Sequence, residues 1–293
     1  MNRINYAAEY SATLAQAFPY ALHYGALWGA PNNGRYRFSG GKKIELPVIT
    51  VAPRSSASRD ALPELSRSYE NRWEEKTLAN QRCWSTLIHP EDVDQTAGAA
   101  SIENVTRVYN DERKFPEMDA YLVSKLFGDF TELGGEVVRA ELSSDNVMAV
   151  FDGLMAGMTE ALVPVGGRVL YVTPAVKNMI KESAGGSRLV SGTGLERDVL
   201  SIDGVKVVEV PSLFLKTAYD LSDGVEPAGD AEQIQMFLVH PDSVITPVSY
   251  QFACLDEPTA ATGGKYVYYE ESFEDVFILE NRYRGLAFVL PED

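Results

Sequence analysis

SIENVTRVYNDERKFPEMDAYLVSKLFGDF, residues 101–130, is the longest run in this chain of 293 residues in which apolar side chains recur at helical spacing. Ile102, Val105 and Tyr109 recur at intervals of three and four residues. The same spacing resumes after Pro116, at Met118, Tyr121, Leu122, Lys125 and Leu126. Acidic and basic side chains occupy the opposite face. This periodicity predicts an amphipathic helix of about 30 residues, which is a rod roughly 40 Å long.

Pro116 interrupts the helical run, because proline has no amide hydrogen for the helical hydrogen bond. The sequence leaves two structures open. One is a single kinked helix; the other is two helices, the second with Pro116 at its first position and Glu117 and Asp119 near its positive end. In either case we expect a spine between a long extended region before it and an α/β domain after it.

The charge balance limits the classes of function. The chain has 26 basic and 42 acidic side chains and a formal charge of −16, which argues against a surface that grips nucleic-acid phosphates. A container for DNA needs no such affinity and is not excluded. Cys83 and Cys254 fit neither a disulfide framework nor a metal motif, as expected for two small buried residues in a reducing compartment.

Membrane and export signals are also missing from the sequence. No run reaches the roughly 18 apolar residues of a membrane span. The N-terminus lacks the layout of a signal peptide. The sequence therefore predicts a soluble protein that is not exported.

Residues 35–95 have the pattern of an extended region. Apolar and polar side chains alternate on both sides of the turn Ser39-Gly40-Gly41, which predicts a β-hairpin. A second alternating run begins at Tyr69 and includes Trp73, and a connection rich in Ser and Arg separates the two runs. Because a lone two-stranded hairpin is marginally stable in water, this loop needs a surface to lie on.

Residues 1–34 are rich in Ala and Tyr and end in a cluster of turn-forming residues. Their large apolar side chains would be a liability if exposed on a free monomer. Two interpretations stay open: a helix packed on its own domain, or an arm packed on a neighbouring subunit. The side chains concerned are Phe18, Tyr20, Leu22, Tyr24, Leu27 and Trp28.

The chain after the spine alternates helices and strands and predicts a mixed α+β fold. A helix is expected from Ser143–Asp145 to about Leu162, with Leu162 on its apolar stripe. A strand at 168–173, a helix to residue 183 and a strand after the tight turn at Asp203-Gly204 follow. Further strands are expected in QMFLVHPDSVITPV, residues 235–248, and in the closing residues 265–291.

Three passages resemble the major capsid proteins of tailed bacteriophages, whose fold was first seen in phage Hong Kong 97. In many siphophage capsid proteins the spine region reads PE-x-DAY-x-x-SKL, as residues 116–126 do here. The second passage, NRWEEKTLANQRCWSTLIHPEDVDQT (71–96), resembles the return strand of the extended loop of that family. The third, GRVLYVTPAVKNMIKES (167–183) with IDGVKVVEVP (202–211), resembles strand and helix pairs of the axial domain.

The resemblance implies a domain layout and a function. Residues 1–34 would be an N-terminal arm, 35–95 an extended loop, 96–164 a peripheral domain with the spine helix, 165–265 an axial domain, and 266–293 closing strands of the peripheral domain. The expected protein is not an enzyme. It assembles through pentamers and hexamers into the icosahedral shell of a tailed phage.

The resemblance also implies partners and a location. The shell would enclose double-stranded DNA without sequence-specific binding or any membrane. A portal is implied, and so is a separate scaffolding protein or an already trimmed chain, because no scaffolding segment fits before the arm. The protein would reside in the virion, and in the host cytoplasm before assembly.

The arm and the loop are expected to lie on adjacent copies, which would bury their apolar faces and close rings by repeating one contact. Basic side chains of the loop are expected to meet acidic ones on a neighbour's spine, with a solvated strand edge as the alternative. The expected inter-subunit residues are Phe18, Tyr20, Trp28, Arg35, Tyr36, Arg37, Phe38, Lys43, Arg54, Arg72, Trp73, Asp111 and Glu112.

Other chemistry has weak support, and we predict no catalytic residue, cofactor or metal. His89 with Glu91, Asp92 and Asp94 could ligate a cation, but close acids are more often a solvated turn. SGTGLER, residues 191–197, lacks the third glycine of a dinucleotide-binding motif. The alternatives to a phage capsid subunit are an encapsulin-like compartment shell of the same fold and, less favoured, a soluble α/β enzyme.

Overall fold

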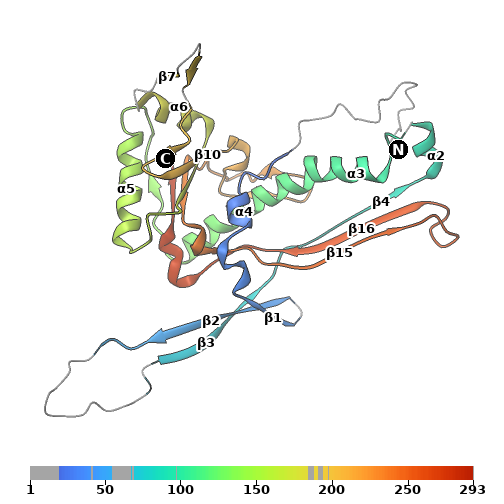
Figure 1. Ribbon diagram of the computed structural model, residues 1–293, viewed down its shortest axis with the longest axis horizontal. Helices are drawn as coiled ribbons and strands as arrows, with labels where there is room; N and C mark the ends of the chain where they lie inside the picture. The colour runs from blue at the N-terminus through green and yellow to red at the C-terminus, as the bar shows by residue number, and fades with distance from the viewer. Residues whose placement is uncertain are drawn as a thin grey trace.

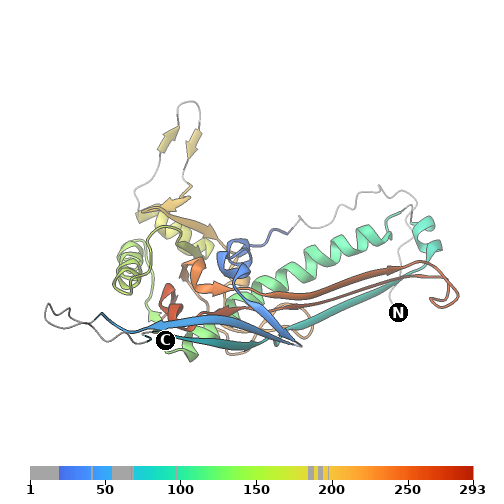
Figure 2. The ribbon, with the colours of Figure 1, turned by 60° about the horizontal axis from the view of Figure 1, so that its bottom comes forward.

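The computed structural model describes residues 20–40, 42–54, 67, 69–96, 98–183, 188–190, 194–196 and 198–292. The chain forms a compact α/β unit, an elongated part built on a long helix, and a long hairpin that projects away from both (Figures 1 and 2). The mixed α+β class expected from the sequence is confirmed. None of the helices in these residues combines the length and apolar character needed to cross a membrane.

The spine is one continuous helical rod (Figure 1). It consists of α3 (Ile102–Tyr109), a π-helical segment (Asn110–Lys114) and α4 (Phe115–Glu132). Pro116 lies in the first turn of α4, directly after the wider π turn. A π segment accommodates a local interruption of the α-helical hydrogen bonds, so the run continues through the proline. The predicted helix is confirmed, with a π segment at the expected interruption.

A three-stranded antiparallel sheet, here called the spine sheet, runs along the spine (Figures 1 and 2). Its strand order is β15 (Val248–Asp256), β16 (Tyr266–Glu274), β4 (Gln81–Ile88). The Trp84 ring of β4 stacks on the Tyr109 ring of α3 with centroids 3.9 Å apart. This aromatic contact fixes the middle of the sheet against the helix.

The hairpin predicted around residues 39–41 is confirmed, and so is the predicted two-stranded loop that includes the run from Tyr69. β1 (Arg37–Gly40) pairs with β2 (Lys43–Val51), and β2 pairs with β3 (Tyr69–Thr77) in antiparallel register from Lys43–Thr77 to Val51–Tyr69. We call β2 and β3 the long hairpin. At its base, the buried Asp275 carboxylate accepts hydrogen bonds from the Ala79 amide and the Tyr121 hydroxyl, which ties the hairpin to the spine.

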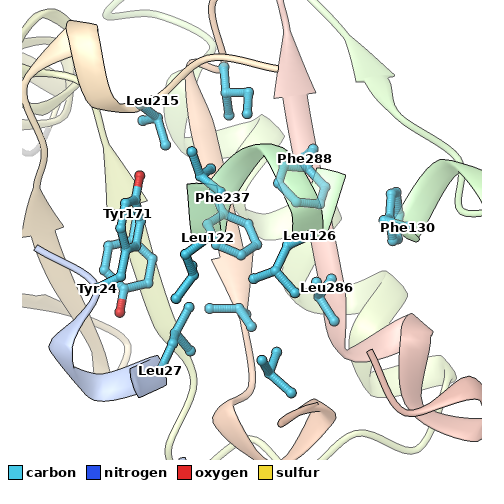
Figure 3. Packing of buried hydrophobic residues seen from close by; sticks show 14 of the residues in the cluster. Tyr24, Leu27, Leu122, Leu126, Phe130, Tyr171, Leu215, Phe237, Leu286 and Phe288 are labelled. Atoms are coloured by element: carbon cyan, nitrogen blue, oxygen red, sulfur yellow. The ribbon is translucent and has the colours of Figure 1, made fainter. Parts of the chain in front are cut away.

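The α/β unit is built on a six-stranded sheet of order β5-β18-β13-β6-β10-β9. Helices α5 (Val147–Glu160) and α6 (Pro174–Ser183) pack on one face, and α4 packs on the other together with residues 24–28. Figure 3 shows the core between the sheet and α4. In this core the Phe237 and Phe288 rings stack with their centroids 4.4 Å apart. The strands are β5 (Val138–Arg139), β6 (Val169–Val172), β9 (Ser201–Ile202), β10 (Val205–Glu209), β13 (Met236–Val239) and β18 (Leu286–Leu290).

Short elements connect these parts. The turn at Asp203-Gly204 has positive φ at both residues, as the predicted tight turn requires. The remaining elements are α1 (Gly25–Trp28), α2 (Pro90–Gln95), β7 (Arg188–Val190), β8 (Gly194–Glu196), β11 (Tyr219–Asp220), β12 (Glu226–Pro227), β14 (Val244–Ile245) and β17 (Phe277–Ile278), with 3₁₀ turns at Pro31–Gly34, Ser212–Phe214, Pro241–Ser243 and Glu280–Gly285.

Three strands pair outside the group expected from their position in the chain. β4 pairs with β16 in the spine sheet, although it falls within the range expected for the extended loop. β15 pairs with β16 in the spine sheet, although it falls within the range expected for the axial domain. β18 pairs with β13 in the α/β unit, although it was expected among the closing strands of the peripheral domain. Burial explains the position of β18. This strand is apolar along its length, as expected for a strand that is covered on both faces of its sheet.

Leu162 is also placed differently from its prediction. It lies beyond the end of α5 with φ of 62° and is 90% exposed, so it is not part of the apolar stripe. The rest of that stripe is confirmed, because Val147, Phe151, Leu154 and Met158 are buried.

Candidate assembly surfaces

One face of the long hairpin is an uncovered apolar surface. Residues that pair across antiparallel strands share a face, and the register places Val51 opposite Tyr69, Ile49 opposite Asn71 and Pro47 opposite Trp73. Among these six residues, Asn71 is the polar one. The exposed fractions are 64% for Ile49, 70% for Val51, 51% for Tyr69 and 43% for Trp73. We call these four residues the hairpin stripe. A contiguous apolar stripe of this kind marks a partner surface.

The base of the long hairpin is held by its own charges. The Arg37 guanidinium lies 3.7 Å from the centre of the Trp73 ring and 2.6 Å from the Glu45 carboxylate. The Lys43 ammonium lies 2.9 Å from Glu75. Arg37 and Lys43, expected to meet a neighbour's acids, therefore have partners within the sheet formed by β1, β2 and β3 of their own chain.

The other bases expected at an interface are exposed. Arg35, Arg54 and Arg72 have no acidic partner in the part of the chain that the structure describes. Their expected counterparts, Asp111 and Glu112, lie on the π segment of the spine, and Glu112 is exposed. The structure does not bring these bases and acids together within one chain, so their inter-subunit contact stays a prediction.

Two aromatic residues of the first hairpin were also expected at an interface. The Tyr36 and Phe38 rings meet edge to face, 5.3 Å apart. Tyr36 packs against a small core that includes Ile44 and Leu46, whereas Phe38 is 49% exposed. Only Phe38 of this pair therefore leaves a large apolar face free for a partner.

Residues 20–34 pack on their own chain. Tyr24 and Leu27 are completely buried in the core beside α4 (Figure 3). Trp28 packs against the same core. Of the two interpretations of this segment, the contacts of residues 20–34 favour packing on their own domain. Phe18 lies outside the described residues.

Asp119 holds this segment in place. Its buried carboxylate accepts hydrogen bonds from the Tyr20 hydroxyl (2.8 Å), the His23 amide (2.8 Å) and the Tyr24 amide (3.3 Å). The sequence placed Asp119 only as an acid near a helix start. The sequence did contain a signal for this buried role. Asp119 lies on the same helical stripe as Leu122 and Leu126, which face the core, and an acid on an apolar stripe indicates a buried, hydrogen-bonded carboxylate.

We expect the wild-type protein to lose stability relative to Asp119→Asn as the pH rises. Burial raises the pKa of the Asp119 carboxyl above its usual range, although the hydrogen bonds from His23 and Tyr20 oppose this. The native state therefore holds this proton more tightly than the unfolded chain, whose pKa is about 3.9. The free energy of unfolding then falls as the pH rises from about 4 through the higher native pKa.

Urea unfolding of both proteins between about pH 4 and pH 7 checks this prediction. All other titrating groups are shared, so the difference between the two proteins isolates Asp119. A difference that stays constant with pH would contradict it.

The candidate metal and cofactor residues have structural roles. The His89 Nδ1 accepts a hydrogen bond from the Glu91 amide at the start of α2. The described residues contain no group of three or more His, Cys, Asp or Glu side chains that could hold a metal. Within residues 191–197, Gly194–Glu196 form β8, which pairs with β7 in a hairpin. The two cysteines are free, and Cys83 is exposed rather than buried.

Several solved structures with similar folds come from phages. Mycobacterium phage Che8 gives a TM-score of 0.62 at 14% identity, with 97% of each chain covered. The capsid structure of the Cyanophage P-SCSP1u gives 0.64 at 11% identity over 98% of this chain and 93% of that one. The mature capsid of bacteriophage PhiM1 gives 0.62 at 15% identity over 85% and 82%. No protein-family model and no curated protein sequence matches this chain.

The chain has the fold of phage capsid proteins. The match covers nearly the whole chain, including the spine, the long hairpin and the α/β unit. The Hong Kong 97-like fold expected from residues 71–126 and 167–211 is therefore confirmed. Because the identities are 11–15%, the likeness establishes the fold alone.

Proposed function

We propose that this protein is the major capsid protein of a tailed phage and forms the icosahedral shell of the virion. The observation that carries the proposal is the hairpin stripe: a long projecting hairpin, within a capsid fold, exposes an apolar face that the described residues of its own chain leave uncovered. A subunit that projects such a face onto the next copy makes a heterologous contact, and repetition of that contact closes rings. The shell then encloses DNA without needing to bind it.

Further parts of the proposal concern the partners. Pentamers and hexamers of this chain would form the shell, with a portal at one vertex and a separate scaffolding protein during assembly. The acidic surface supports enclosure rather than binding, since a formal charge of −16 repels phosphates. The role proposed is structural, with no catalytic step.

Electron microscopy of the purified protein, alone and with a candidate scaffolding partner, tests the proposal. We expect closed shells or tubes of hexamers. A monodisperse monomer in both samples, at concentrations well above micromolar, would overturn the proposed function. The unassembled subunit from the same preparation can be used for the urea unfolding measurements.

A further inference from the structure

A hollow of about 490 Å³ lies where the spine, the spine sheet and the α/β unit meet. We call it the junction pocket. The π segment and the start of α4 form one wall, β4 and β16 form a second, and the loop 221–225 forms a third. The charged side chains of the lining determine which ligands it can hold.

Acidic groups outnumber basic ones in the lining. Five carboxylates and three bases line the junction pocket. Two of the bases are already paired: Arg82 lies 2.5 Å from Glu117, and Lys114 lies 3.1 Å from Glu270. The acids that remain are Glu112, Asp223 and Glu274, against Arg113 as the third base.

Glu274 is the acid that most needs a cation. It is 6% exposed, and its Oε1 accepts a hydrogen bond from the Ser272 hydroxyl at 2.8 Å. No basic side chain in the described ranges forms an ion pair with it. A buried carboxylate without a cation is unfavourable, and a positively charged guest would relieve that penalty.

The Tyr109 phenol lies within the same acidic lining. Burial is the main cause that raises the pKa of Tyr109; the charges of Glu270, Glu117 and Glu274 raise it further, and the charge of Arg82 lowers it. Around this phenol the acids therefore outnumber the base.

Aromatic rings complete the lining. Trp84 and Tyr109, stacked with an interplanar angle of 8°, line the junction pocket together with Trp28, Tyr121 and Phe214. Aromatic rings and carboxylates together are the groups that recognise organic cations, because the ring faces attract positive charge and the stem of the ligand packs on them. A small hydrated metal ion would gain little from these rings.

We propose that the junction pocket binds an alkylammonium or guanidinium group. The group can come from a Lys or Arg side chain of a second copy, or from a free polyamine. Arg54 and Arg72 are exposed and lack an acidic partner in the described chain, which makes them available as donors between copies. The second-copy source rests on the proposed function, whereas the site itself does not.

Titration of agmatine, which carries one ammonium and one guanidinium, into the unassembled full-length subunit tests the site. A Trp73→Phe background leaves Trp28 and Trp84, both in the pocket lining, as the fluorescent reporters. We expect saturable binding of agmatine and none of N-butylurea, which is uncharged. Glu274→Gln, which keeps the shape of the side chain, should weaken agmatine binding about tenfold.

Two further variants make the test decisive. Glu257→Gln, an exposed acid outside the pocket, should leave agmatine binding unchanged. Glu112→Gln, an exposed acid in the lining, should weaken binding about threefold and replaces Glu274→Gln if that variant does not fold. Equal binding of agmatine and N-butylurea, or equal affinity of the wild type and the lining variants, would overturn the proposal.

An assembly experiment separates the two sources. If a side chain of a second copy occupies the pocket, saturating agmatine slows shell formation in the wild type but not in Glu274→Gln. If a free polyamine occupies it, agmatine leaves assembly unslowed in both. Either result retains the organic-cation site. Because binding is measured on the unassembled subunit, its failure is distinguishable from failure to form shells.

Discussion

Replacing Ile49, Val51 and Tyr69 of the hairpin stripe with serine is expected to abolish closed shells while the subunit stays folded. The three side chains are more than half exposed in the free chain, so their loss removes little from the subunit itself. On a neighbouring copy, burial of each would contribute about 1 kcal/mol or more, from about 25 cal/mol per Å² of apolar surface. The loss recurs at every contact in the shell, which makes its effect on assembly large.

A matched control lies on the other face of the same strands. Thr50 and Glu70 pair across the long hairpin and point away from the stripe. Thr50→Ser with Glu70→Gln should form normal shells. Electron microscopy and sedimentation of both variants check the prediction, and circular dichroism checks that the subunit is folded. Normal shells from the triple serine variant would remove the support for this contact.

The parts of the fold set by local patterns could be predicted from the sequence. Helical spacing on both sides of Pro116 indicated the spine, and alternation around Ser39-Gly40-Gly41 indicated the first hairpin. Both signals lie within about 30 residues, so no long-range pairing is needed to read them. The resemblance at residues 116–126 then added the order of the parts.

Long-range pairing could not be predicted in the same way. β18 lies between β13 and β5, and nothing near residues 286–290 indicates those partners. The role of Asp119 depends on amides almost 100 positions away in the chain. The common face of Trp73 and Tyr69 in the hairpin stripe could be predicted from the alternation of apolar and polar residues. The exposure of that face could not, because it depends on which surfaces the rest of the fold covers. The junction pocket combines side chains from six separate segments, so no local motif indicates it.

Arg168→Ala is expected to lower the free energy of unfolding by about 4 kcal/mol. The Arg168 guanidinium is buried and donates to the carbonyl oxygens of Met155, Val163 and Pro164 at 3.1, 2.7 and 2.9 Å. It also donates to the Thr159 hydroxyl at 3.2 Å. The Val163 and Pro164 carbonyls lie in the turn after α5, where helix-terminal carbonyls need donors from outside the helix. The Met155 carbonyl also accepts a hydrogen bond from the Thr159 hydroxyl at 2.8 Å.

The charge of Arg168 is itself unfavourable where it lies. Burial lowers the pKa of this guanidinium, and no acid pairs with it in the described ranges. The hydrogen bonds to the carbonyls, together with the negative end of the α5 dipole, offset that penalty. Removal of the side chain leaves several buried acceptors without a donor at once, which is why the expected loss exceeds that of a single hydrogen bond.

Urea unfolding of the unassembled subunit measures the effect. Arg168→Lys keeps the charge but presents fewer directed donors, so we expect an intermediate loss of about 2 kcal/mol. Arg107→Ala is the control, since Arg107 is exposed on α3 and should change the free energy by less than about 0.5 kcal/mol. A loss below about 1 kcal/mol for Arg168→Ala would mean that water reaches these carbonyls without the arginine. In that case α5 would be held to the sheet by its apolar stripe alone, and Arg168 would be a tolerated charge rather than the cap of the helix.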